Sequence, residues 1–206
     1  MHFLPSFADD THAVVLVEGA SDKHALEALA RRRGRDLDAE GISVVAMGGA
    51  QAIGTFLSAL GPHGRGVELA GLCDAAEEGH FRRALEQAGF GSNLTRSRTE
   101  ALGFFVCVAD LEAELIRSLG AAAVERVLEV QGDLGPFRTF QKQPAWRERP
   151  PEEQLRRFIG THSGRKIESA ALLVDALDLA RVPPPLDGVL AHVKPTGPPG
   201  RRPGGP

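Results

Sequence analysis

The sequence contains no tyrosine and only two cysteines among its 206 residues. A chain without tyrosine cannot form a covalent tyrosyl-DNA intermediate, so that class of DNA chemistry is excluded. Cys73 and Cys107 both lie in apolar stretches without a neighbouring histidine cluster. Such cysteines indicate buried thiols in a reducing compartment and exclude a structural zinc site built on them.

Long hydrophobic runs are missing as well. No apolar segment approaches the roughly 20 residues of a membrane-spanning helix. The first ten residues have neither the basic nor the apolar region of a signal peptide. We therefore expect a cytoplasmic protein without a membrane partner. Its net charge of -3 gives no general attraction to nucleic acid, so any contact with DNA must come from local basic patches.

Four short apolar runs alternate with helical patterns in the first part of the chain, beginning near Val14, Ile42, Leu69 and Phe104. Each run is long enough for a strand that is buried on both faces. Strands that alternate with helices predict an α/β fold, a parallel four-stranded sheet with helices on both faces.

Beyond residue 120 only helical patterns remain, and they cover residues 121–130, 152–159, 166–180 and 186–193. We therefore predict a core domain over residues 1–120 and a helical C-terminal extension over residues 121–193. Residues 194–206 are rich in proline and glycine, which predicts a disordered tail.

Acidic residues follow three of the four predicted strands. Glu18 and Asp22 follow the first strand, Asp74 the third, and Asp110 with Glu112 the fourth. The carboxyl ends of parallel strands meet at one edge of the sheet, where ligands bind in such folds, so we expect these side chains to lie close together. Clustered carboxylates repel one another unless a cation neutralises them, and oxygen ligands suit Mg²⁺ or Mn²⁺. Such a site commonly acts on phosphates.

A plainer interpretation of single residues stays open beside this one. Glu18 taken alone fits a solvated residue at a strand end, and Asp22 fits a charge that stabilises a helix N-terminus. Arg31 and Arg32, near the end of the first helix, fit either a solvated helix terminus or contacts with phosphates. The recurrence of acids after three strands favours a shared site.

Two segments resemble the TOPRIM (topoisomerase-primase) domain. The segment Val17-Glu-Gly-Ala-Ser-Asp22 is similar to its glutamate motif after the first strand, and Asp74-Ala-Ala-Glu-Glu-Gly79 to its D-x-D-x-x-G motif after the third. The likeness is to the TOPRIM part of the overcoming lysogenization defect (OLD) nucleases, in which a second acid follows the first glutamate by four residues. It covers roughly residues 12–193.

Two further elements of that family have counterparts in the sequence. Asp110-Leu-Glu112 corresponds to a polar-x-Glu element after a later strand, and Lys166 corresponds to a lysine near the start of a C-terminal helix. The resemblance implies a metal-dependent endonuclease that hydrolyses DNA phosphodiesters. It implies that one or two Mg²⁺ or Mn²⁺ ions are held by a set of acids: Glu18, Asp22, Asp74 and Glu112, with Asp110 assisting. Lys166 would offset negative charge in the transition state, and Arg165 would share that role or contact the DNA backbone.

The sequence departs from the family at two points. Ala76 stands where D-x-D-x-x-G has its second aspartate, so either Glu77 or Glu78 substitutes as a ligand or activity is lost. Residues 160–166 lack the spacing of a Walker A loop, so the ATPase or helicase of the family would be a separate chain, or the protein acts without one.

Other function classes remain for comparison. A degenerate TOPRIM module that binds nucleic acid or a partner ATPase without cutting is the alternative that Ala76 favours. A phosphoacceptor receiver domain would need adjacent acids after the first strand and a shorter chain. A topoisomerase would need tyrosine, and a primase would need a zinc module and a longer chain. The sequence leaves the oligomeric state open.

Overall fold

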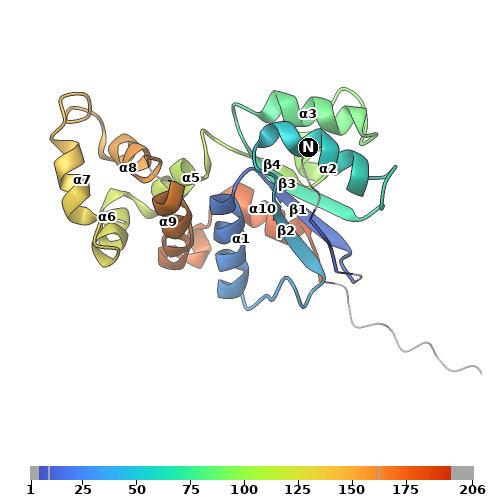
Figure 1. Cartoon of the computed structure of the whole chain (residues 1–206), viewed down its shortest axis with the longest axis horizontal. Coiled ribbons are helices and arrows are strands. Elements are labelled where there is room, and N and C mark those ends of the chain that lie inside the picture. Colours follow the sequence, from blue (N-terminus) through green and yellow to red (C-terminus); the bar gives the residue numbers. More distant parts are fainter. Residues whose placement is uncertain (1–4, 9, 162, 196–206) are drawn as a thin grey trace, which may run out of the picture.

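The computed structural model describes residues 5–8, 10–161 and 163–195. At its centre is a parallel sheet with the strand order β2-β1-β3-β4 (Figure 1). All three strand pairs are parallel, so the strands end at one common edge. The strands are β1 (Ala13–Val17), β2 (Ile42–Ala46), β3 (Glu68–Asp74) and β4 (Phe104–Cys107). The predicted four-stranded parallel α/β sheet is confirmed.

Strand β1 is central to the sheet and is buried on both faces. Ala13, Val15 and Val17 belong to one hydrophobic core, whereas Val14 and Leu16 belong to the other. All five have no exposed surface. Successive side chains of a strand point to opposite faces, so a strand between two helical layers must be apolar at every position.

Helices cover both faces of the sheet (Figure 1). The core on one face is shared with α2 (Ile53–Leu60), which a 3-10 turn, η1 (Ala50–Ala52), precedes, and with α3 (Glu78–Gln87); α4 (Arg96–Ala101) lies against β4. The core on the other face is shared with α1 (Ala20–Arg32), α5 (Leu111–Leu119) and α10 (Pro184–His192).

The same second core continues into the helices that follow α5. These are α6 (Ala121–Val130), α7 (Leu134–Gln141), α8 (Pro151–Ile159) and α9 (Ser163–Ala176), with the 3-10 turn η2 (Leu179–Arg181) after α9. Helix α9 packs against α1, and Arg32 of α1 donates hydrogen bonds to the carbonyl oxygens of Val174 and Leu177, both at 2.7 Å. The extension and the sheet are therefore joined by one continuous hydrophobic core.

The helix predictions were correct in outline and wrong in some details. Helix α6 spans the predicted residues, but the helix predicted to reach residue 180 ends at Ala176, because Asp178 caps a separate 3-10 turn there. Helix α7 was missed. Its Gly135-Pro136 pair is typical of a loop, yet proline is tolerated in the first turn of a helix. The tail predicted over residues 194–206 lies outside the described residues from 196 onward.

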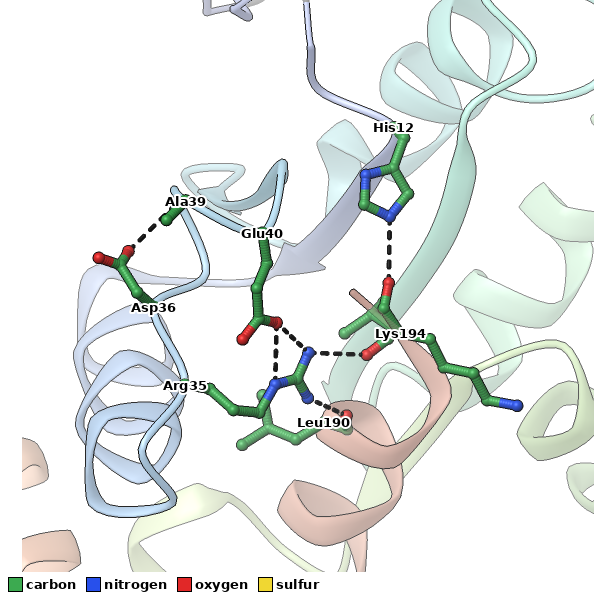
Figure 2. Close-up of polar contacts among 8 residues, drawn as sticks. His12, Arg35, Asp36, Ala39, Glu40, Leu190 and Lys194 are labelled. Carbon is green, nitrogen blue, oxygen red and sulfur yellow. Dashed lines mark hydrogen bonds and ion pairs between the residues drawn. The ribbon is translucent and has the colours of Figure 1, made fainter. Parts of the chain in front are cut away.

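Arg35 ties the loop after α1 to the end of α10, near His12 at the start of β1 (Figure 2). Its guanidinium donates to Glu40 Oε2 at 2.6 and 2.9 Å, to the carbonyl oxygen of Leu190 at 2.5 Å and to that of Val193 at 2.9 Å. Glu40 immediately precedes the turn into β2, so these bonds hold the C-terminal helix against the amino edge of the sheet.

Each described helix is too short or too polar to traverse a lipid bilayer.

Replacing Arg35 by methionine should lower the free energy of unfolding by about 2–3 kcal/mol, because Glu40 and two carbonyl oxygens would lose a charged donor in a largely buried place. Urea unfolding followed by circular dichroism measures the change. Arg31→Met removes the same charge from an exposed position of the preceding helix, α1, and should cost about 0.5 kcal/mol or less. Equal losses in the two variants would contradict the role assigned to Arg35.

Candidate active site

Glu18 directly follows β1 and is fixed by backbone donors from two neighbouring segments. The backbone N–H of Asp74 donates to Glu18 Oε1 at 3.0 Å. The Glu18 carbonyl oxygen accepts from the N–H groups of Gly48 and Gly49, at 3.1 and 3.0 Å. Both glycines have positive φ, which glycine adopts without strain and which brings these two donors to one oxygen. The Glu18 side chain is thus held between the ends of β1 and β3.

Asp22 combines a structural role with a place in the acidic cluster. Its Oδ2 accepts from the backbone N–H of Gly19 at 2.9 Å, which satisfies the N-cap donor at the N-terminus of α1. Burial is the main cause that raises the Asp22 pKa, and the nearby charge of Asp110 raises it further. Both interpretations of Asp22 therefore apply: it caps a helix and it shares the edge with other acids.

Asp110 and Glu112 are positioned by the turn between β4 and α5. Ala109 has φ of 73°, a left-handed conformation that is rare for a residue other than glycine, and it turns the chain after β4. Asp110 then caps α5 by accepting from the backbone N–H of Ala113 at 2.8 Å. Glu112 lies in the first turn of α5, only 3% exposed.

Lys166 brings a positive charge from α9 to these acids. Its Nζ lies 3.2 Å from Glu112 Oε2. The same ammonium group opposes the rise in the pKa values of Glu18, Asp22 and Asp74. The structure therefore brings together, around one lysine, acids that follow β1, β3 and β4.

Burial and mutual repulsion make these carboxylates hard to ionise together. Burial is the largest cause that raises the pKa of Asp74 to about 7 and that of Glu112 to about 6. Burial also raises the pKa of Glu18. The neighbouring acids add to each rise, since like charges at close range disfavour one another. A cation bound at this edge would relieve that repulsion.

The donor chemistry fits a divalent cation. All the candidate ligands are carboxylate oxygens, and Glu112 Oε1 is buried without a hydrogen-bond partner among the described residues. The side chains as they stand do not converge on one point: within residues 5–8, 10–161 and 163–195, no three acidic, histidine or cysteine side chains form a ready set of ligands. Glu112 is engaged by Lys166 instead, so a bound cation and Lys166 would compete for that carboxylate.

Ala76 and the two glutamates after it differ in their exposure and in their charged neighbours. Ala76 itself is exposed. Glu77 is half-buried, and its charge helps to raise the pKa of Glu18, so it lies on the side of the acidic cluster. Glu78 forms an ion pair with Arg96, which lowers its pKa. Of the two residues predicted as substitutes for the missing aspartate, Glu77 is therefore the one that acts on the cluster.

The predicted phosphate-contacting arginines have different surroundings. Arg32 donates to carbonyl oxygens at the end of α9, and Arg165 donates to Asp133 at 2.7 Å, so both are engaged within the protein. Arg31 is exposed on α1. The assignment of phosphate contacts to these three residues stays a prediction.

Arg156 of α8 is a further charged residue at the site, and the sequence interpretation missed it. Its Nε and Nη2 both lie 2.7 Å from Asp110 Oδ2. The hydrogen bond to Asp110 is the main cause that raises the Arg156 pKa, and the charges of Asp110, Asp74 and Glu112 raise it further. Arg156 follows no strand and belongs to no motif, so nothing in its spacing distinguishes it from Arg157 beside it.

Comparisons with known proteins agree with this geometry. Residues 10–75 match the family model described as the TOPRIM domain of overcoming lysogenization defect protein-like proteins. The fold matches the C-terminal region of the Xanthomonas campestris pv. campestris OLD protein, with a TM-score of 0.69 and 24% identity over 90% of this chain and 95% of that one. It also matches the C-terminal region of the Burkholderia pseudomallei OLD protein, with a TM-score of 0.69 and 20% identity over 88% and 96% of the two chains. No protein with a curated description matches the sequence.

The raised pKa values predict that the metal-free protein loses stability as the pH rises from about 4 to 8. In the folded state Asp74 and Glu112 keep protons that the unfolded chain has already released, so the stability gained from those protons is present at low pH and is lost as the pH passes through about 6 to 7. Asp74→Asn should lessen the fall by on the order of 1–2 kcal/mol, after allowance for solvent screening. Urea unfolding at several pH values, with a chelator present, measures this. An unchanged slope in Asp74→Asn would contradict the raised pKa.

Proposed function

Because residues 10–75 belong to the OLD-like TOPRIM family and nearly the whole chain has the fold of OLD C-terminal regions, we propose that this protein is a divalent-metal-dependent nuclease that hydrolyses DNA phosphodiester bonds. TOPRIM domains are in general domains of nucleases and primases. The observation that carries the proposal is that acids from three strand ends lie at one edge of the sheet, near Lys166.

The metal is Mg²⁺ or Mn²⁺ in this proposal, since TOPRIM domains generally bind divalent metals and every candidate donor is an oxygen. The residues that would hold it are the acids at the sheet edge: Glu18, Asp22, Asp74 and Glu112, with Asp110 assisting and Glu77 in place of the acid missing at Ala76. When bound, a divalent cation supplies charge neutralisation at phosphoryl oxygens and lowers the pKa of water.

Lys166 is the residue of this chain that we assign to charge stabilisation. Although burial disfavours its charge, the carboxylates of Glu112 and Asp22 raise the Lys166 pKa, so the ammonium group keeps its proton at neutral pH. A preorganised cation in a partly buried site stabilises the extra negative charge that develops on a phosphate under attack. Release of Lys166 from Glu112 would free both groups for those separate roles.

Partners follow from the same resemblance. DNA is the proposed substrate, and an ATPase or helicase is the proposed companion. A non-catalytic module that binds DNA or this companion is the second candidate. Ala76 and the absence of three converging ligands among the described residues favour it. The charge of Glu77 beside Glu18 favours the nuclease.

Mn²⁺ binding should depend on Glu18. Glu18→Gln keeps an acceptor for the Asp74 N–H but removes the charge, so calorimetric titration should show affinity for Mn²⁺ reduced by roughly 10-fold or more. Glu125→Gln is the matched control, because Glu125 pairs with Arg138 in the helical extension. Equal affinity in wild type and Glu18→Gln would remove Glu18 from the ligand set.

Purified protein should nick supercoiled plasmid with Mn²⁺, and more slowly with Mg²⁺, which demands near-ideal octahedral geometry. Glu18→Ala and Asp74→Ala should abolish nicking because each removes a ligand charge. Lys166→Ala should slow it by about 100-fold, the usual effect of losing one preorganised charge-stabilising group. Lys142→Ala, at an exposed position after α7, should leave the rate unchanged.

Ala76→Asp distinguishes the two candidate functions. It restores the aspartate of the family motif, so it should raise nicking with Mg²⁺ if the alanine is a partial defect. Gel assays measure the nicking of supercoiled plasmid by wild type and Ala76→Asp, each with Mg²⁺ and with Mn²⁺. If both proteins are inert with either metal, this chain alone is no nuclease, and the binding module takes its place.

A further inference from the structure

A pocket of about 440 Å³ adjoins the acidic cluster on the side of the helical extension. It is lined by α8, by the connection before it and by the cap of α5: Asp110, Trp146, Glu153, Arg156, Arg157 and Gly160. Its volume is within the range of roughly 300–1,000 Å³ that is typical of small-molecule sites. Asp110 belongs both to this pocket and to the acidic edge, so a group bound here lies beside the candidate active site.

One arginine of the pocket makes no ion pair within the described part of the chain. Arg156 pairs with Asp110 at 2.7 Å, and Arg149 lies 3.8 Å from Glu153. Arg157 is exposed and makes no ion pair or side-chain hydrogen bond within the described part of the chain. The negative charges of Asp110 and Glu153 are thus balanced by the two paired arginines. Arg157 adds a net positive charge to the pocket, which suits an anion such as a phosphate.

The pocket also presents a supported aromatic ring. Trp146 is half-buried and stacks on Phe140, with ring centroids 5.3 Å apart and planes 30° from parallel. Phe140 in turn packs against Phe158 of α8 at 5.7 Å. The Arg157 guanidinium lies over the indole at 5.9 Å from its centroid, at the outer limit of roughly 6 Å for a cation–π contact. A flat group that takes the place of Arg157 on the ring displaces this one weak contact and breaks no ion pair.

We propose that this pocket binds an unpaired nucleobase of single-stranded DNA, stacked on Trp146, with Arg157 on the adjoining phosphate. The inference rests on the proposed function, because the same strand then continues to the acids that adjoin Asp110. An aromatic ring beside a positive charge is the usual means of holding single strands without sequence preference. A base inside a duplex has both faces covered by its neighbours, so a duplex cannot use the ring unless a base leaves the stack.

The fluorescence of the protein tests the stacking directly. Trp146 is the sole tryptophan and the chain has no tyrosine, so the emission reports this one residue. Titration with a thymidine oligonucleotide of about 15 nucleotides, in a chelator so that nothing is cut, should quench the emission along the binding curve given by anisotropy of the labelled strand. A blunt duplex of the same length should quench far less. Binding without quenching, equal quenching by the duplex, or no binding of the oligonucleotide would each overturn the proposal.

Variants distinguish binding in this pocket from a general electrostatic attraction between the protein and DNA. Arg157→Ala should weaken binding of the oligonucleotide by roughly 10-fold, the scale of one stacking or charged contact. Trp146→Phe should keep part of the affinity and Trp146→Leu should lose it, with circular dichroism to verify that each protein is folded. Arg126→Ala removes an equal charge from a separate pocket between α6 and α9 and should bind as wild type does. An equal loss in Arg126→Ala and Arg157→Ala would refute a specific pocket.

The two proposals fail in different ways. If the protein binds the oligonucleotide with quenching but does not nick plasmid, the proposed base-binding pocket is supported and the nuclease proposal is wrong. If the protein nicks plasmid with Mn²⁺ but shows no quenching, the nuclease proposal is supported and the proposed base-binding pocket is wrong.

Discussion

The ion pair between Lys166 and Glu112 is the interaction on which the edge of this sheet depends. Parallel strands end together, and here their ends carry acids that would repel one another in a partly buried place. Lys166 is a positive charge that lies among them, as Arg156 does, and it comes from a helix outside the sheet. The packing of α9 against α1 therefore does more than bury apolar surface, because it also sets where that charge sits.

Sequence patterns were sufficient for the sheet and for the position of the acids at its edge. The apolar run of β1 is too short for a buried helix, so it indicates a strand, and an acid at a strand end is placed by the strand before it. Motif spacing placed Lys166 near these acids, and the roles assigned to the acids and to Lys166 stay predictions. The oligomeric state, the cytoplasmic location and the division into core, extension and tail stay predictions.

Arg156, Glu77 and α7 show where sequence patterns stop being informative. Arg156 reaches Asp110 across a contact between α8 and α5, and a contact between segments distant in the chain leaves no periodic trace. The difference between Glu77 and Glu78 depends on Arg96, which pairs with one and leaves the other near Glu18. In α7 a Gly-Pro pair concealed a helix whose Phe137 is fully buried. In each case a tertiary partner decided the outcome.

The distance along the chain between α1 and α9 has a consequence for how the protein forms during synthesis. Arg32 bonds to Val174, 142 residues further along the chain, so the two helices meet only after residue 174 has left the ribosome. Until then α1 lacks the cover of α9, and the acids at the strand ends lack their lysine. Long-range contacts of this kind slow folding, because the loop must close before the contact is formed. The core that α1 shares with α9 is thus completed late in synthesis, and its apolar residues stay open to water until α9 is made.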